Sequence, residues 1–370
     1  MYLSSIRFKN LRNLDEKSVE LTHTLNVFEG ENAAGKSSIL EGIGFLLTGR
    51  SFRTAKTPQL VRFNDSGLVL NGKLSDGTII GIGFDKGKKT KAIRIDGEDV
   101  YSLSKLASLY PVQLLTPESY HLIDSGPNQR RRFFDWLLFH VEHSYRRSWK
   151  ELNRTLKQRN SYLRSLKGEI SSLDNQVLNS WDVRLVEVSN HIDNHRLLIL
   201  KKIKENLTPI LRSMSLSFVD SLSIEYKYGY NGKSLSEKLK DSVLRDIVNR
   251  STSYGAHKAD YVIKNNGVEV KESLSRGQKK MLINALFLSQ TQLLKEETNR
   301  NSLFVIDDFS SELDDANQLQ LVKALHKHNN VQVIISCLDS RVLKPLIKEY
   351  NSVSMFHVKH GEISKVTLQS

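Results

Sequence analysis

The stretch that decides the fold, residues 26–47, reads NVFEGENAAGKSSILEGIGFLL. A short apolar run leads into a loop of small residues, and the loop ends in Gly-Lys-Ser where an apolar pattern of helical period begins. The loop matches the pattern Gly-x-x-x-x-Gly-Lys-Ser through Gly30, Gly35, Lys36 and Ser37. A strand, this loop and a helix in that order predict a phosphate-binding loop, whose backbone N–H groups surround the phosphates of a nucleotide.

The residues of this loop are candidate ligands for ATP and Mg²⁺. Lys36 would neutralise the β- and γ-phosphate oxygens, and Ser37 would bind the Mg²⁺ ion. The alternative is an ordinary glycine turn that binds no anion. The other residues expected to line the nucleotide are Gly30, Glu31, Asn32, Ala33, Ala34, Gly35 and Ser38.

A second segment, residues 301–315, reads NSLFVIDDFSSELDD and places two aspartates directly after four apolar residues. A buried strand that delivers a carboxylate at its C-terminal end is what a Mg²⁺ site beside a phosphate-binding loop needs. We expect Asp307 to hold Mg²⁺ through water. We expect Asp308 to orient or deprotonate the attacking water.

A third segment, residues 272–288, reads ESLSRGQKKMLINALFL. Ser275 is predicted to cap the helix that follows, and the N–H groups at the start of that helix would form another anion site. Taken alone, the segment favours an ordinary cap ahead of an amphipathic helix.

The composition is that of a basic globular protein. The chain has 370 residues, of which 39% are hydrophobic and 26% charged, so a substantial core is expected rather than disorder. Lys and Arg number 54 against 41 Asp and Glu, which gives a net charge of +13. This excess of positive charge favours a polyanionic partner, and nucleic acid is favoured over a membrane surface. The alternative is a basic protein that has no such partner.

The sequence predicts a cytoplasmic protein. No apolar run approaches the roughly 18 residues that a membrane span needs, and the first residues, MYLSSIRF, alternate like a strand rather than a signal peptide. Cys337 is the single cysteine, so a reducing compartment is expected. Because Cys337 ends an apolar run, we interpret it as a buried structural thiol and not as a nucleophile.

The rest of the chain predicts two further kinds of structure. Residues 1–30 predict two strands joined by a turn, and residues 68–100 predict short antiparallel hairpins. The lysine run 86–91 falls on a hairpin tip and is interpreted as a solvated turn, with a DNA contact as the alternative.

The pattern of residues 145–208 predicts a helical hairpin closed by Pro209. This hairpin would be either a projecting arm or a packed subdomain. Its heptad seam comprises Trp149, Leu152, Leu156, Leu163, Leu166, Ile170, Leu173 and Val177, with Arg159 as the polar interruption.

These segments together resemble the ABC-type ATPases. The signature Leu-Ser-Arg-Gly-Gln at 274–278 and the D-loop-like residues 311–314 belong to that class, and the inserted coiled coil is similar to its SMC-like branch. Within that branch the chain resembles the RecF family of bacterial DNA repair proteins over nearly its full length. The motifs that carry this resemblance are FKNLRNLD at 8–15, GRSFR at 49–53, GPNQRRRFFDW at 126–136, YGAHKADY at 254–261, LSRGQ at 274–278 and IDDFSSELD at 306–314.

The resemblance implies an α/β fold, with an ABC-type ATPase head made of a P-loop mixed sheet and an antiparallel β lobe. The head would comprise residues 1–144 and 209–370, with the helical arm 145–208 inserted. Ser275 of one subunit would cap the γ-phosphate held by the partner's copy of the phosphate-binding loop, in an ATP-dependent homodimer. Arg12 and Arg53 are candidates for phosphate or inter-subunit contacts, and Gln113 is a candidate Q-loop glutamine. His257 and Lys258 would flank the nucleotide or hold the arm.

The resemblance further implies a weak DNA-dependent ATPase of recombinational gap repair that clamps duplex and gapped DNA. With RecO and RecR it would help to load the recombinase.

The chain departs from the family at three positions. Ala33 stands where glycine is frequent, Lys258 where arginine is frequent, and Ala256 where proline is frequent. The switch histidine of ABC transporters is absent after the strand 331–335, which argues against a transport ATPase and against fast hydrolysis. A non-hydrolytic DNA clamp with a vestigial ATP site is the main alternative, and an SMC-like nuclease would need a further metal-binding domain.

Overall fold

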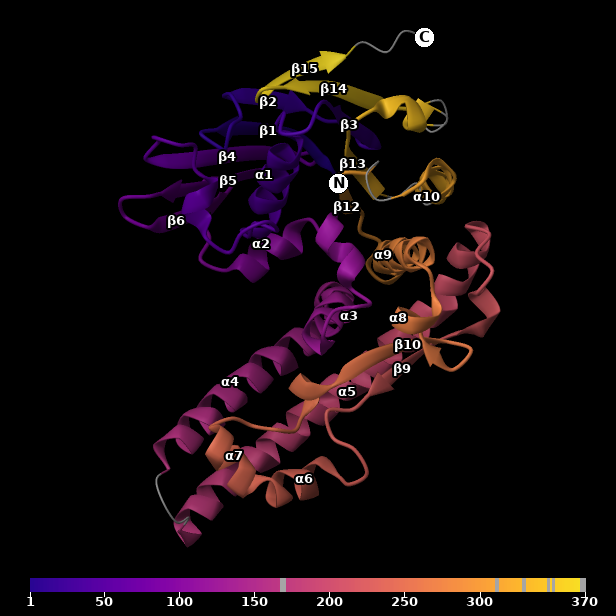
Figure 1. Cartoon of the computed structure of the whole chain (residues 1–370). Coiled ribbons are helices and arrows are strands. Elements are labelled where there is room, and N and C mark those ends of the chain that lie inside the picture. The colour runs from indigo at the N-terminus through magenta and orange to yellow at the C-terminus, as the bar shows by residue number, and fades with distance from the viewer. Residues whose placement is uncertain (167–170, 310–312, 328–330, 345–346, 348–349, 367–370) are drawn as a thin grey trace. The chain divides into compact units, whose positions relative to one another are not determined.

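Figure 1 shows the computed structural model, which describes residues 1–166, 171–309, 313–327, 331–344, 347 and 350–366. The chain forms two compact units, each with its own set of helices and strands. Unit 1 comprises Met1–His121, Pro209–Leu216 and Ser275–Ser370, and unit 2 comprises Leu122–Thr208 and Ser217–Leu274. None of the helices in these described parts is both long and apolar enough to cross a membrane.

Unit 1 contains a mixed sheet in the order β15-β14-β3-β13-β12-β8. All neighbours pair in parallel except β15 with β14. Strands β12 and β13 are buried along their whole length, which is why most of their residues are apolar. Parallel strands place their carboxyl ends at one edge, and β3 enters the phosphate-binding loop at that edge. The strands are β3 (Leu25–Glu29), β8 (Val112–Leu115), β12 (Ser302–Ile306), β13 (Val331–Cys337), β14 (Val353–Lys359) and β15 (Glu362–Val366).

A second, antiparallel sheet of unit 1 has the order β2-β1-β4-β5-β6-β7. The hairpins predicted for residues 68–100 are confirmed by its last four strands. The first 30 residues contain three strands rather than the predicted two, because the short, mostly polar segment KSVE also pairs, along β1. The strands are β1 (Leu3–Lys9), β2 (Lys17–Glu20), β4 (Gly67–Leu74), β5 (Ile79–Asp85), β6 (Thr90–Ile95) and β7 (Glu98–Asp99).

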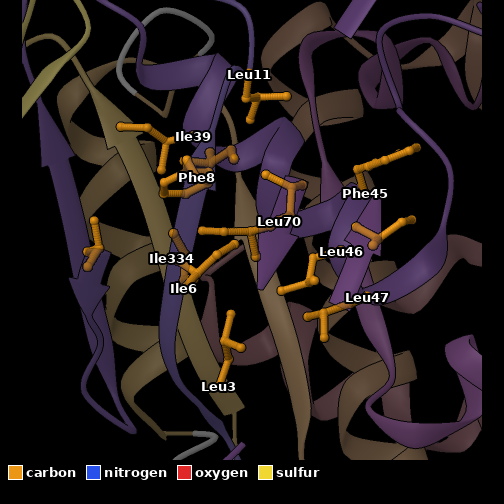
Figure 2. Close-up of a cluster of buried hydrophobic side chains, with 14 of the residues drawn as sticks. Leu3, Ile6, Phe8, Leu11, Ile39, Phe45, Leu46, Leu47, Leu70 and Ile334 are labelled. Atoms are coloured by element: carbon orange, nitrogen blue, oxygen red, sulfur yellow. The ribbon is translucent and has the colours of Figure 1, made fainter. Parts of the chain in front are cut away.

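Helix α1 (Lys36–Thr48) contacts strands of both sheets, and the hydrophobic cluster around it joins side chains from each (Figure 2). Sequence periodicity predicted one apolar face for this helix, but it is buried on nearly all sides. The close packing requires a glycine within α1, since a Cβ on Gly42 would lie 2.5 Å from a methyl carbon of Leu11. The remaining helical segments of unit 1 are η1 (Thr57–Leu60), α2 (Leu103–Leu109), η2 (Pro117–His121), α9 (Arg276–Thr298), α10 (Asp315–Lys327) and η5 (Ser340–Leu343).

Unit 2 is built from helices and a three-stranded antiparallel sheet in the order β11-β10-β9. Its strands are β9 (Leu222–Lys227), β10 (Asp260–Asn265) and β11 (Val268–Glu269). Its helical segments are α3 (Pro127–Val141), α4 (His143–Ser165), η3 (Val219–Ser221), α6 (Leu235–Asp241), α7 (Val243–Asn249), η4 (Ala256–Lys258) and α8 (Val270–Ser273), together with most of α5 (Ser172–Ser213).

The predicted helical hairpin is present as α4 and α5, but two of its details were wrong. The seam does not run along one helix, because α4 ends at Ser165 and Leu173 and Val177 belong to α5; Ile170 lies outside the described residues. Helix α5 also continues through Pro209 to Ser213. A proline removes one backbone hydrogen bond and bends a helix, but a long packed helix tolerates it.

The polar interruption of the seam, Arg159, is fully buried. Its guanidinium donates to Asp182 at 2.6 Å, to Asp246 at 2.8 Å and to the hydroxyl of Thr252 at 3.0 Å. Burial raises the pKa of Asp182 although Arg159 acts in the opposite direction. Helices α4, α5 and α7 are therefore joined by a buried charge cluster at a position where a coiled coil would carry an apolar residue.

Candidate nucleotide-binding site

An open pocket of about 920 Å³ lies in unit 1 at the start of α1. Pockets for cofactors measure about 300–1,000 Å³, so a nucleoside triphosphate fits this size. The pocket brings together residues that are far apart in the sequence. The predicted site residues that line it are Arg12, Asn32, Ala33, Gly35, Lys36, Ser37, Ser38, Arg53 and Asp308.

The phosphate-binding loop has the backbone that an anion site needs. Gly35 is the N-cap of α1 with φ 117°, and neither a side-chain cap nor an acidic residue satisfies the first turn of the helix. Ala33 also has a left-handed φ of 64°. Alanine pays roughly 1–2 kcal/mol for that conformation, which explains why glycine suits this position better. Gly30 is required for a different reason, since a Cβ there would lie 2.2 Å from the carbonyl oxygen of Val358.

Lys36 is buried at the base of this loop. Its Nζ donates to the carbonyl oxygens of Gly30 at 2.6 Å and Glu31 at 2.8 Å. The loop thus holds the ammonium group with neutral acceptors. A phosphate would offer an anionic acceptor, and charge-assisted hydrogen bonds are about twice as strong as neutral ones.

The predicted metal ligands meet at the carboxyl ends of β12 and β13. Ser37 Oγ donates to Asp307 Oδ1 at 2.9 Å, and Ser336 Oγ donates to the same oxygen at 2.7 Å. Burial raises the pKa of Asp307, while the two hydroxyl hydrogen bonds oppose that shift. A buried carboxylate with two hydroxyl donors and no cationic partner among these contacts is stabilised when a cation binds beside it.

Ser37 and Asp307 fit a Mg²⁺ site that the nucleotide completes. The described residues contain no group of three or more His, Cys, Asp or Glu side chains able to hold a metal by themselves. Mg²⁺ in nucleotide sites is held by one or two protein oxygens together with phosphate oxygens and waters. When bound, the ion would neutralise the charge on the phosphate oxygens.

Asp308 lies in different surroundings from its neighbour. Asp307 is buried, whereas Asp308 lines the pocket. The chain turns between them, because Asp308 has φ 56° and its backbone N–H donates to Ser336 Oγ at 2.8 Å. The geometry therefore separates one carboxylate beside Ser37 from one that faces the pocket.

Arg12 and Arg53 are held by a residue that sequence reasoning missed, Glu41 of α1. Glu41 is fully buried and accepts two hydrogen bonds of 3.0 Å from Arg12. Arg53 lies 3.6 Å from the same carboxylate, and the hydroxyl of Ser51 also donates to it. An acidic residue inside a helix pattern normally faces solvent, so only the spatial convergence of the two arginines reveals this role.

A second feature missed from the sequence supports the loop from behind. The turn between β14 and β15 packs on it, with the N–H of Gly361 donating to Ala34 O at 2.8 Å. A Cβ on Gly361 would lie 2.0 Å from Asn13 O. The dipeptide His360-Gly361, with left-handed φ values of 49° and 91°, is the sequence signal of this hairpin.

Other predicted site residues lie away from the pocket. Ser275 is exposed at the start of α9, where its Oγ accepts from the N–H of Gln278 and Gln278 Oε1 accepts from the N–H of Ser275. Gln113 is buried on β8 and donates to Gln290 of α9 at 3.0 Å, so its side chain points to the helix that covers the sheet. It does not line the pocket.

The remaining expectations concern the loop after β12 and unit 2. Residues 310–312, which include the first two of the four D-loop-like residues, lie outside the described residues. Asp314 caps the start of α10 by accepting from the N–H of Asn317. His257 and Lys258 belong to unit 2. Nε2 of His257 lies 3.1 Å from Thr252 O, and burial lowers the pKa of His257 to about 4. Cys337 is buried and its pKa is raised to about 12 by burial, as expected for a structural thiol.

Comparison with known proteins finds relatives that match nearly the whole chain. Residues 2–364 match the family described as RecF/RecN/SMC N terminal domain. The DNA replication and repair protein RecF of Hahella chejuensis is 36% identical, covering 99% of this chain and 100% of that protein, and RecF of Proteus mirabilis is 35% identical over 98% and 99%. The structure of the recombination mediator protein RecF with ATP in the RecFOR pathway has a TM-score of 0.84 at 29% identity, covering 99% of both chains.

The fold is shared more widely. An SMC head bound to the C-winged helix domain of ScpA has a TM-score of 0.58 at 13% identity, covering 100% of this chain and 98% of that one, which is a likeness of fold alone. The predicted fold class, an ABC-type ATPase head with a helical insertion, is thereby confirmed.

Proposed function

This chain belongs to the RecF family, and on that premise we propose that it is an ATP-dependent DNA-binding protein of recombinational gap repair. One observation carries the proposal: a single pocket collects Lys36, Ser37 and Asp308 with two arginines anchored on a buried glutamate. The full-length relatives are named DNA replication and repair proteins, and a similar RecF chain is described with ATP.

In the proposed mechanism, the backbone N–H groups at the start of α1 and the ammonium group of Lys36 bind the phosphates. Ser37 and Asp307 would hold Mg²⁺, which would neutralise phosphate charge, and Asp308 would orient the attacking water. Arg12 and Arg53 lie at the same pocket and add positive charge toward the γ-phosphate.

We further propose that ATP acts by joining two copies of the chain. The pocket is open, and Ser275 stands exposed on another part of unit 1. The capping box engages Ser275 Oγ only as an acceptor, so its hydroxyl proton is available to a γ-phosphate bound by the partner. An interface that includes both γ-phosphates is lost on hydrolysis, which makes the dimer a switch.

The dimer would bind duplex DNA near single-strand/double-strand junctions, in the cytoplasm, through phosphate contacts. The net charge of +13 supports binding of this sequence-independent kind. The RecFOR pathway named for the structural relatives supports RecO and RecR as partners in loading the recombinase.

The trans role of Ser275 is tested by Ser275→Ala. We expect the monomer to bind ATP almost as tightly as the wild type, but ATP no longer to produce dimers in light scattering. Loss of the cap itself should destabilise the protein by only about 1 kcal/mol. Ser234→Ala is the matched control, since Ser234 forms the same capping box with Glu237 on α6. Normal ATP-driven dimers of the Ser275 variant would refute the trans contact.

The alternative function is a non-hydrolytic DNA clamp. The variant Asp308→Asn distinguishes this clamp from an ATP-hydrolysing protein. If Asp308 activates water, phosphate release should fall roughly 10²–10⁴-fold, while ATP-bound dimers should persist longer. Asp76→Asn makes the same charge change at an exposed hairpin turn and should leave turnover unchanged. The absence of phosphate release by the wild type, with or without duplex DNA, would favour the clamp.

A further inference from the structure

The pocket contains one large apolar side chain that the phosphate chemistry does not use. Phe63 is 88% exposed and lines the same pocket as the phosphate-binding loop. An aromatic ring left so open has no packing role within the folded chain. Its position on the wall of a ligand pocket suggests that a ligand covers it.

The backbone around Phe63 is held firmly although its ring is exposed. The preceding residues pair with the N-terminal part of the chain, since the N–H of Arg12 donates to Leu60 O and the N–H of Arg62 donates to Asn10 O, both at 2.8 Å. A turn follows, in which the N–H of Asp65 donates to Arg62 O. The ring therefore stands on a fixed support, which is the property that a stacking surface needs.

Lys86 completes this wall of the pocket. It begins the lysine run that was interpreted as a solvated hairpin tip, and it is the lysine of that run found among the described pocket-lining residues. Its backbone N–H donates to Ser66 O at 2.8 Å, and its Nζ lies 3.4 Å from Arg62 O. An ammonium donor thus lies beside the turn that carries the exposed ring.

We propose that Phe63 and Lys86 form the base subsite of the nucleotide pocket, with the ring of Phe63 stacked on a purine and Lys86 donating to the edge of the base or to the ribose. This inference rests on the proposed function, because it assumes that the phosphates occupy the loop. A purine offers a larger π-face for stacking than a pyrimidine does. Because stacking tolerates different bases, the subsite should discriminate strongly between a nucleotide and bare polyphosphate, and only weakly between ATP and GTP.

The test is isothermal titration calorimetry of the full chain with ATP, ADP, GTP and inorganic tripolyphosphate. Phe63→Ala should weaken ATP, ADP and GTP about 5- to 100-fold, the usual range for loss of a stacking ring, and leave tripolyphosphate unchanged. Phe63→Trp should keep the affinity, and the introduced indole should be quenched by nucleotide but not by tripolyphosphate. Tyr101→Ala removes a 95% exposed aromatic ring outside the pocket lining and should change nothing.

The outcomes separate the subsite from the function on which it depends. Equal ATP affinity of Phe63→Ala and wild type overturns the subsite alone, as does an equal loss of tripolyphosphate affinity. A loss seen with ATP but not with ADP also overturns it, because Phe63 would then act at a γ-phosphate-dependent interface between copies. If the wild type binds neither ATP nor tripolyphosphate, the proposed function fails and the subsite fails with it.

Discussion

Lys36→Ala is expected to weaken ATP binding at least about 100-fold and to abolish ATP-driven dimers. Removing one partner of a buried, hydrogen-bonded charge pair costs about 2–5 kcal/mol, and the phosphates would keep their charge while losing the ammonium group that compensates it. The fold should survive, because Lys36 Nζ donates only to two carbonyl oxygens of its own loop in the described contacts, and Lys36 itself lines an open pocket that water can enter. Calorimetric titration with ATP and thermal unfolding measure the two effects separately.

Two further variants test whether the loss of ATP binding comes from the contact between the Lys36 ammonium group and the phosphates. Lys36→Met keeps the aliphatic part of the side chain and should lose ATP to the same extent. Lys105→Ala removes the same charge from an exposed position on α2 and should bind ATP normally. If Lys36→Met bound ATP as well as the wild type, the loop would bind phosphate through its backbone alone and the proposed role of Lys36 would be wrong.

Much of the fold was predictable because its signals are local. The runs at 303–306 and 331–335 are fully buried parallel strands, and such strands are mostly apolar because both of their faces are covered; Gln332 is the polar exception in the second run. The Asp-Gly turns between residues 68 and 100 marked the antiparallel hairpins. Strand β2 was missed because a short edge strand with one buried residue has no periodic signal, and the end of α4 was misplaced because α5 continues the same heptad spacing.

The candidate site likewise contains residues that the sequence predicts and residues that it does not reveal. The phosphate-binding loop and the double aspartate are contiguous motifs with a chemical meaning of their own. Glu41 and Ser336 carry no such signal, since their roles arise only when separate elements meet: Glu41 where two loop arginines converge, and Ser336 where β13 ends beside β12. Gln113 carries no decisive signal either, because an isolated polar residue on a strand gives the same sequence pattern whether it faces a ligand or a covering helix.

Arg159→Met is expected to produce the largest loss of stability, about 3–5 kcal/mol, because it leaves Asp182 and Asp246 in the interior without their cation. All three tryptophans of the chain, at positions 136, 149 and 181, lie in unit 2. Urea unfolding followed by tryptophan fluorescence therefore reports on the unit that contains the substitution. Arg184→Met is the matched control, since Arg184 pairs with Glu151 and Glu187 on the exposed surface of α4 and α5 and should contribute little.

The pH dependence of the Arg159 variant distinguishes a buried charge from simple loss of packing. Burial already raises the pKa of Asp182, and removing Arg159 takes away the main influence that lowers it. A carboxyl group whose pKa is higher in the folded than in the unfolded state binds its proton more tightly when folded, so it adds stability as the pH falls through the folded pKa. The folded pKa of Asp182 should therefore be higher in Arg159→Met than in the wild type. As the pH falls from neutral through the interval between these two pKa values, the stability deficit of the variant should shrink. A deficit that stayed constant with pH, or one no larger than that of Arg184→Met, would mean that Arg159 acts through its aliphatic packing and not as the cation of the cluster.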